Sequence, residues 1–437
     1  MKSKRLFFIL IAAALLLVGW MLTMKAVSGS ENRKKQQELI AQADGFLEKE
    51  LYVRAIPLYE EAARLKTKDS SAAEEKLLKA YQAYGDENSF LSLVQKRIQA
   101  KTATEQEYLD AAAIYLNSWQ YSKAMEVLRD GLANTDSEAI RDYYEENRFE
   151  YTLRSTVFQT ILPTAQNTLM PAFDGEKWGY VNENGRIELD AVYEEALPFN
   201  QNGYAVVKKD GKYITITSEG AKYGLDENPA SDVYGITSRH VLACVNGSYS
   251  YYNLDFECVA PGHQYEAITA NNDGVAAVKK NGSWGVITDS GDVVVDFVLE
   301  DVAVNSLGKA FSGGYAMVKQ NGSWFLINTK GEKQSETGYY NAKAPESDGL
   351  IAVADENDLW GYIDTAGKQV IDYAYEDALS FSEHLGAVKK NGYWGYLSER
   401  GELVIENVYS QADPFHNGIA QVGFEDAAAL IKLSDRP

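Results

Sequence analysis

Residues 276–295 read AAVKKNGSWGVITDSGDVVV, and this stretch decides the fold of the second half of the chain. One apolar segment precedes Asn281-Gly282, and another begins at Trp284. Asn and Gly both tolerate positive φ, so Asn-Gly between apolar runs is a strong β-hairpin signal. Gly291 and the apolar residues 293–295 follow and indicate a further strand. The stretch therefore predicts three consecutive antiparallel strands.

The same pattern returns along the chain at intervals of 34 to 40 residues. Its aromatic position is filled in turn by Trp178, Tyr213, Tyr249, Trp284, Trp324, Trp360 and Trp394. A further short segment, such as residues 193–199 or 375–381, comes earlier in each unit. Each unit is thus predicted to hold four short strands, named a to d in chain order. Strands that are apolar on both sides fit a propeller blade packed between two neighbours.

The Trp-Gly pair, with a turn glycine about six residues later and Ala-Val-Lys-Lys-Asn-Gly before it, resembles the bacterial WG-repeat family. The residues that define the repeat are Trp178, Gly179, Trp284, Gly285, Trp324, Trp360, Gly361, Trp394 and Gly395. Tyr213 and Tyr249 replace Trp in two units, and Phe325 replaces Gly in a third. The resemblance implies an interaction module and brings no catalytic residue with it. The glycine after Trp is expected to leave room for side chains of a neighbouring blade.

The two ends of the repeat region predict a closed ring. The last unit ends before a fourth strand, whereas residues 149–153 alternate apolar and polar ahead of the first complete unit. We expect this segment to complete the last unit and so remove an exposed sheet edge. Residues 148–437 are therefore predicted to form an all-β, propeller-like ring of about eight four-stranded WG repeats. An open β-solenoid is the alternative.

Residues 29–147 carry the periodicity of amphipathic helices. The pattern of residues 52–62 returns at residues 121–132, an interval of 69 residues or about two repeats of 34. This interval, with Ala at fixed positions, resembles the tetratricopeptide family, although no Trp opens the first helix and no Pro closes the second. The chain is thus predicted to be multidomain, α then all-β. The three predicted helical repeats form either a peptide-binding groove or a spacer.

The N-terminal segment, residues 1–28, is predicted to be a signal-anchor. Its apolar run, residues 6–23, is long enough as a helix to span a bilayer, and basic residues flank the run on both sides. We expect a single-pass protein in the cell membrane with its body outside the cytoplasm. Secretion after cleavage near Ser28 is the alternative.

Composition excludes several classes of function. The chain has 63 acidic against 42 basic residues and a net charge of −21, so nucleic acid and anionic lipid repel it. Cys244 and Cys258 fall on strands b and d of one unit, too far apart for a disulfide, and are predicted to be free thiols that fill the core. The four histidines lack metal-ligand spacing.

No catalytic, cofactor-binding or metal-binding residue is predicted. Residues 355–358 are acidic but lack the spacing of a calcium loop, so they are interpreted as a solvated turn. His384 and His416 both follow a strand-a Phe and are interpreted as solvent-exposed loop residues.

Seven lysines share one position, just before the predicted turn between strands b and c. They are Lys208, Lys209, Lys279, Lys280, Lys319, Lys389 and Lys390. In a ring they would lie on one face and offer a candidate binding face for an acidic protein or a cell-envelope polymer. The alternative is that acidic residues of the adjoining turns, such as Glu194-Glu195 and Glu376-Asp377, neutralise them.

These observations favour a non-catalytic, membrane-anchored scaffold that binds another protein or peptide at the cell envelope. A lectin-like propeller that binds carbohydrate or cell wall is the alternative, and exposed aromatic residues on blade loops would favour it. A hydrolase would need paired carboxylates or a metal cluster at the central channel, which no sequence pattern offers.

Overall fold

The computed structural model describes residues 30–65, 67, 70–164, 169–224, 230–237, 240–259, 265–347, 349–424 and 427–434. The chain divides into two compact units, Met1–Arg148 and Phe149–Pro437. The predicted anchor, residues 6–23, lies outside the described residues. Of the helices that are described, none is both long and apolar enough to cross a bilayer.

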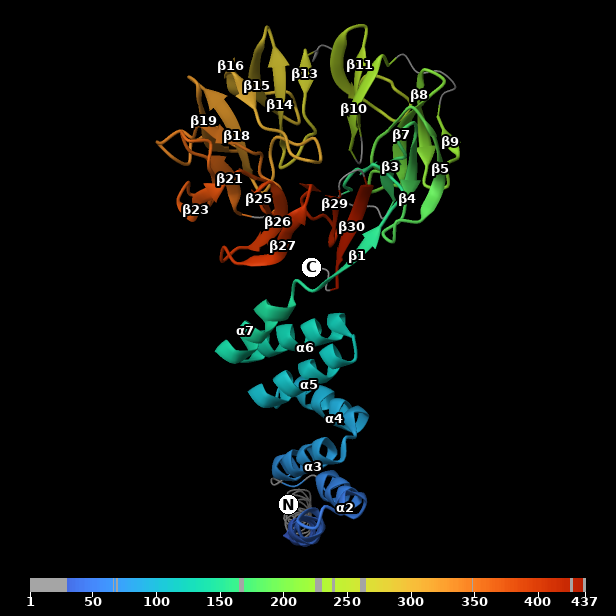
Figure 1. The fold of residues 1–437 in the computed structure, drawn as a ribbon, viewed down its shortest axis with the longest axis vertical. Coiled ribbons are helices and arrows are strands. Elements are labelled where there is room, and N and C mark those ends of the chain that lie inside the picture. The colour runs from blue at the N-terminus through green and yellow to red at the C-terminus, as the bar shows by residue number, and fades with distance from the viewer. Residues whose placement is uncertain are drawn as a thin grey trace, which may run out of the picture. The chain divides into compact units, whose positions relative to one another are not determined.

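The first unit is helical. Residues 30–47 form a helix, and the helices that follow are α2 (Tyr52–Arg64), α3 (Ser70–Tyr84), α4 (Glu87–Gln99), α5 (Glu105–Asn117), α6 (Tyr121–Asn134) and α7 (Glu138–Asn147). Successive helices pack against one another (Figure 1). Helices α2, α4 and α6 begin at residues 52, 87 and 121, which agrees with the interval of about 34 residues in the sequence.

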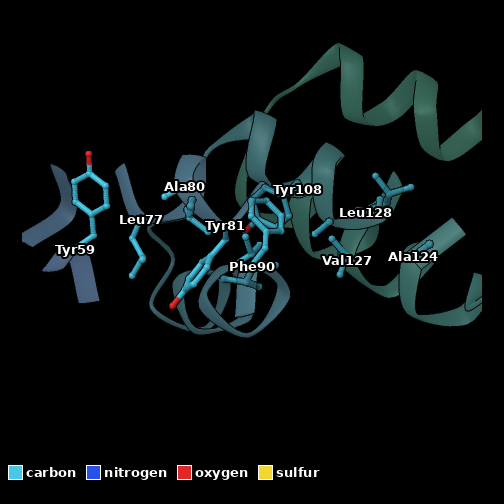
Figure 2. Packing of buried hydrophobic residues seen from close by; sticks show 14 of the residues in the cluster. Tyr59, Leu77, Ala80, Tyr81, Phe90, Tyr108, Ala124, Val127 and Leu128 are labelled. Carbon is cyan, nitrogen blue, oxygen red and sulfur yellow. The ribbon is translucent and has the colours of Figure 1, made fainter. Parts of the chain in front are cut away.

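Local capping and one buried ion network fix these helices. The Thr104 side chain and Glu107 form a reciprocal capping box at the start of α5. The Glu107 carboxylate also accepts a hydrogen bond from Arg97 of α4 at 2.9 Å, and Arg97 reaches Glu74 of α3 at 3.1 Å. Figure 2 shows buried aromatic and aliphatic side chains of successive helices that belong to one core. Three helices are thus joined by both apolar and ionic contacts.

The second unit is an eight-bladed β-propeller, with its sheets arranged around a centre (Figure 1). The first four blades follow one another along the chain. Blade 1 holds β2 (Thr160–Ile161), β3 (Met170–Phe173), β4 (Trp178–Val181) and β5 (Ile187–Tyr193); blade 2 holds β6 (Glu195–Ala196), β7 (Tyr204–Lys209), β8 (Lys212–Thr217) and β9 (Lys222–Tyr223). Blade 3 holds β10 (Asp232–Ile236), β11 (Val241–Val245) and β12 (Ser248–Tyr252); blade 4 holds β13 (Ala267–Ile268), β14 (Val275–Lys280), β15 (Ser283–Thr288) and β16 (Val293–Leu299).

The remaining blades continue the same order, and the last one uses both ends of the domain. Blade 5 holds β17 (Asp301–Val302), β18 (Tyr315–Gln320) and β19 (Ser323–Asn328); blade 6 holds β20 (Asn341–Ala342), β21 (Ile351–Ala354), β22 (Trp360–Ile363) and β23 (Gln369–Tyr375). Blade 7 holds β24 (Asp377–Ala378), β25 (Leu385–Lys390), β26 (Tyr393–Ser398) and β27 (Leu403–Tyr409). Blade 8 holds β28 (Gln411–Ala412), β29 (Ile419–Phe424), β30 (Ala427–Leu433) and β1 (Tyr151–Ser155).

Strand β1 closes the ring, as the sequence predicts. It pairs antiparallel with β30, from Tyr151 opposite Leu433 to Ser155 opposite Ala429. This pairing supplies the fourth strand that the last unit lacks and covers the free edge of β30. The open-solenoid alternative is therefore wrong.

The glycine after Trp has a different role from the one expected. A Cβ on Gly395 would lie 2.5 Å from the Ile405 carbonyl oxygen, and one on Gly179 would lie 2.6 Å from the Leu189 oxygen. Both oxygens belong to strand d of the same blade, where the register shifts opposite the glycine. The glycine thus admits a bulged outer strand of its own blade rather than a neighbouring blade, because a bulge brings that backbone closer.

Candidate functional site

The blade topology places the loops of the propeller at two edges of the ring. Strands run antiparallel in the order a, b, c, d, so the turns between b and c lie at the same edge as the connections from d to the next a. The loops between a and b lie at the opposite edge. We name these the hairpin edge and the channel edge.

The predicted lysines lie at the hairpin edge, but most of them contact nearby side chains of the propeller. Lys208 pairs with Glu195 at 2.8 Å, and its ammonium lies 5.0 Å from the centre of the Tyr213 ring. Lys279 and Lys319 each lie 5.9 Å from the ring of the Trp near the start of the next strand.

Two further lysines of the set also lie near aromatic rings. Lys280 lies 6.0 Å from the ring of Phe297, and Lys390 lies 6.0 Å from the ring of Tyr375. Both rings belong to outer strands, β16 and β23. Lys209, the last residue of β7, and Lys389, the second-last residue of β25, complete the set.

Acidic residues at this edge bind the turn backbone as well. The Gly N–H of the Asn-Gly or Asp-Gly turn donates to a Glu carboxylate in four blades. The pairs are Gly211 with Glu194, Gly282 with Glu266, Gly322 with Glu300 and Gly392 with Glu376. The edge therefore carries interleaved positive and negative groups. An anion-binding face made of the seven lysines stays a prediction.

At the channel edge, the a–b loop of blade 5 is long. Residues 303–310 lie between strand β17 and Phe311, and Asn305 organises them. Its Oδ1 accepts from the backbone N–H of Leu307 and of Lys309, both at 3.0 Å, and its Nδ2 donates to Pro345 O at 3.1 Å. Ala270 N donates to Gly308 O at 2.9 Å. Bonds to blades 4 and 6 thus hold this loop, which we name the blade 5 loop.

The blade 5 loop also reaches blade 8. Ser306 Oγ lies 2.9 Å from His416 Nε2 and 3.2 Å from Glu346 Oε2, and Ser306 N donates to Glu346 Oε1 at 3.1 Å. Glu346 and His416 expose 6% and 8% of their surface, so both are buried. A proton on Nε2 of a neutral ring lets Ser306 accept from His416 and donate to Glu346. One serine therefore joins blades 5, 6 and 8.

Burial sets the protonation of this cluster. Desolvation raises the pKa of Glu346 to about 7, against the lowering effect of its bonds from Ser306 and of the nearby Lys309 charge. Desolvation, with the Lys309 charge, lowers the pKa of His416 to about 4. Burial also raises the pKa of Asp413 to about 6. Near neutral pH His416 is uncharged, and burial favours the neutral form of Glu346.

The cluster does not have the geometry of a catalytic triad. In a triad the serine donates to one ring nitrogen and the acid binds the other. Here the Glu346 carboxylate and the His416 ring share the hydroxyl of Ser306, and Glu346 lies on the same Nε2 side at 3.7 Å. The prediction that His416 is solvent-exposed is wrong, because the blade 5 loop covers it. His384 is half exposed and faces Glu399 at 3.2 Å.

A cavity of about 490 Å³ opens at the channel edge beside this cluster. The a–b loops of blades 1, 2, 4 and 5 line it, together with strand β10 and Thr237 of blade 3. The lining includes Leu162, Pro198, Tyr234, Ile236, Asn272 and Lys309. Its volume falls within the range of about 300–1,000 Å³ that is common for ligand sites. Tyr234 exposes 43% of its surface there. The channel edge is therefore the candidate functional site.

Two further predictions concern sulfur and metals. Cys244 is buried and Cys258 is exposed, and both are free, so the expectation that both fill the core is wrong for Cys258. Within the described residues, no group of three His, Cys, Asp or Glu side chains gathers as a metal site. Asp355 instead accepts from the backbone N–H of Asn357 and Leu359 within its own turn.

Sequence reasoning missed Ser306, Lys309 and Glu346. A signal was present, because the interval from Trp284 to Trp324 is 40 residues whereas the preceding interval is 35. The extra residues lengthen the a–b loop of blade 5. Glu346 follows Pro345, which stands where other blades have the strand-a Phe, so it occupies the position of His416.

The family model described as WG containing repeat matches five stretches of the chain. They are residues 178–213, 249–284, 284–324, 360–394 and 394–426. The stretches that it passes over between these matches begin with Tyr213-Ile214 and Trp324-Phe325, where Gly does not follow the aromatic residue. The propeller is thus built at least in part of WG repeats.

Solved structures with similar folds are distant in sequence. Sqt1 of Saccharomyces cerevisiae is 12% identical, with 65% of this chain and 98% of that chain covered and a TM-score of 0.42. The WD40 domain of SCAP from fission yeast is 6% identical, with 65% and 98% covered and a TM-score of 0.39. No curated protein matches the chain in sequence.

Proposed function

We propose that this chain is a non-catalytic scaffold, anchored in a bacterial cell membrane, whose propeller binds another protein outside the cytoplasm. The observation that carries the proposal is the cavity of about 490 Å³ at the channel edge, lined by the loops of four blades and by strand β10 of a fifth. WG repeats supply the rigid frame for these loops. Loops fixed by such a frame lose little conformational freedom on binding.

The helical unit extends the same proposal. Its repeat interval of about 34 residues supports a tetratricopeptide-like array that either binds a second segment of the partner or spaces the propeller from the membrane. The apolar run of residues 6–23, flanked by basic residues, supports the anchor. The strongly acidic body supports a protein partner over nucleic acid.

A photoreactive phenylalanine analogue tests the binding role. Placed at Tyr234 in the cavity, it should give discrete protein adducts on irradiation of intact membranes. The matched control is the same analogue at Val298 on outer strand β16, which is 55% exposed. Absence of adducts at Tyr234, or identical adducts at both positions, would reject the cavity as a binding site.

The exposed Cys258 tests the location. A membrane-impermeant maleimide added to intact cells should label the native chain, whereas a Cys258→Ser variant should stay unlabelled because Cys244 is buried. Permeabilised cells supply the positive control. Labelling that requires permeabilisation would show that the body is inside the cytoplasm.

A further inference from the structure

We propose that the channel-edge cavity binds an acidic peptide segment of the partner protein, with a peptide carboxylate paired to Lys309. The inference rests on the proposed function, because it names the chemistry of the partner at the same site.

The charge of the cavity differs from that of the whole chain. The chain carries a net charge of −21, yet the nineteen described residues that line the cavity include no Asp or Glu. Lys309 is the one Lys or Arg among those nineteen. A single cation within a neutral lining attracts one anionic group, whereas the acidic surface around it repels nonspecific anions.

Lys309 is positioned for such a contact. Among the described residues, its ammonium makes no hydrogen bond and no ion pair, although the residue is half buried. Its backbone N–H is held by Asn305 Oδ1 at 3.0 Å. The loop is therefore ordered before any ligand arrives, and a carboxylate would gain a charge-assisted hydrogen bond without displacing an internal partner.

Glu346 is a negative group close enough for its charge and that of Lys309 to interact. Its two oxygens already accept from Ser306 N and Oγ, and it is 6% exposed, so it contacts Ser306 rather than the cavity. Its raised pKa, about 7, leaves it partly neutral at physiological pH, and it therefore offsets only part of the Lys309 charge.

The remaining lining favours a peptide over a sugar. Asn272 and Gln201 offer side-chain amides, which pair with the N–H and C=O groups of a main chain. Leu162, Pro198 and Ile236 add apolar surface, which suits aliphatic side chains. Among the nineteen lining residues, Tyr234 is the one exposed large aromatic ring for stacking on a sugar face.

Peptide selection on the full-length chain in detergent tests the proposal. Two hexapeptide libraries are used, one with free and one with amidated carboxyl termini, each containing Asp and Glu. We expect acidic peptides to be enriched. Enrichment only from the free library assigns the carboxylate to a chain terminus, whereas equal enrichment assigns it to a side chain. Enrichment of neutral or basic peptides from the amidated library would overturn the proposal.

Substitutions of Lys309 then test whether the selected peptide binds at the channel-edge cavity. Fluorescence anisotropy measures the affinity of each variant for that peptide. Lys309→Met should weaken binding at least tenfold, and Lys309→Arg should stay within threefold of the native chain. The matched control is Lys330→Met, which removes an exposed lysine of the same blade. Unchanged binding by Lys309→Met would overturn the site.

Two other outcomes separate this inference from the proposed function. Loss of peptide binding in a Lys280→Glu/Lys390→Glu variant but not in Lys309→Met would move the site to the hairpin edge and leave a protein-binding scaffold. Binding of a uronate oligosaccharide with no acidic peptide enriched would overturn the peptide, and absence of protein adducts from Tyr234 as well would overturn the scaffold.

Discussion

Blades 4 and 5 are neighbours that share nearly the same hairpin of strands b and c. They differ in the a–b loop and in strand d. Both have an Asn-Gly turn, with Asn281 and Asn321 at φ of 53° and 52°. In both, the turn Gly N–H donates to a Glu carboxylate, at 3.0 Å in blade 4 and 3.1 Å in blade 5. Blade 4 then adds the bulged outer strand β16, whereas blade 5 adds no fourth strand to its sheet.

The two blades differ in the residue that follows the Trp of strand c. Gly285 in blade 4 leaves space for Val295 O, which would lie 2.9 Å from a Cβ there. Phe325 takes the equivalent position in blade 5, where its ring is covered by Lys333 at 3.4 Å and approaches Gly338. The ring thus fills space that a bulged strand would need. The hairpin is the constant part of the repeat, and strand d and the a–b loop are the parts that vary.

The largest effect is expected when Gly285 of blade 4 is replaced by Phe, the residue that blade 5 has at the equivalent position. Gly285→Phe places a ring where the backbone of β16 lies, so we expect the outer strand to detach. The free energy of unfolding should fall by about 3 kcal/mol or more, since overpacking is joined by lost strand pairing. Chemical denaturation measures the loss, and hydrogen exchange locates it in residues 293–299.

Gly235→Ala is the control for that variant. Gly235 also lies in a propeller strand and has no positive φ, and a Cβ added to it would meet nothing within 4 Å. Its stability should change by less than about 1 kcal/mol. An equal loss in both variants would mean that any side chain at a strand glycine is harmful, and the specific role of Gly285 would be rejected.

The blade 5 loop gives a second difference, which Glu346→Gln tests. The pKa of Glu346 is about 7 in the folded state, against an ordinary value of 4.5. The folded state is therefore most stable below pH 4.5, and it loses this stability as pH rises from 4.5 to about 7. Gln does not ionise, so the variant should exceed the native chain by about 3 kcal/mol at pH 8 and by little near pH 4.5. His416 has the opposite effect, because its lowered pKa makes the folded state lose stability as pH falls from 6.5 to about 4. His416 is present in both proteins, so this loss cancels when they are compared.

Denaturation midpoints at pH 5 and pH 8 measure this effect. A gain that is the same at both values would show that Glu346 is not held in its neutral form by burial. The control is Glu332→Gln, an exposed carboxylate in the same blade as the loop, for which no pH-dependent gain is expected.

A smaller effect is expected when the phenyl ring of Phe325 in blade 5 is removed. Phe325→Ala loses half-buried apolar area and the contact with Lys333, so the unfolding free energy should fall by about 1–2 kcal/mol. Gln334 and Tyr339 already donate to the backbone of β19, so fast exchange is expected only of residues 335–338 between them, and it should stay fast in the variant. Slower exchange in that segment would show that removal of the ring is enough to create strand d.

The shared hairpin should give the smallest and most equal effects. Glu266→Gln and Glu300→Gln weaken a charge-assisted bond to a turn N–H at an exposed site, which costs about 0.5–1 kcal/mol. Thermal denaturation should place the two variants within a few tenths of a kcal/mol of each other. Unequal losses would show that the hairpins of blades 4 and 5 are not equivalent.

The sequence predicts the hairpins and the ring closure because local chemistry determines them. Asn-Gly turns, the spacing of Trp and the lone strand at residues 149–153 are all visible without tertiary contacts. The contact made by Gly285 was not predictable, since its neighbour Val295 approaches only after strand d bulges. The cluster of Ser306, Glu346 and His416 was hidden for the same reason, because it joins residues up to 110 positions apart.

The way in which blade 8 is assembled determines when the domain is complete during synthesis. Tyr151 pairs with Leu433, which is synthesised 282 residues later. The propeller therefore cannot close until Leu433 has left the ribosome. A contact of such large sequence separation forms late in folding, because loop closure must precede it. If the chain is exported, the final blade can form only after Leu433 has been translocated, and removal of residues 428–437 would leave β1 without its partner strand.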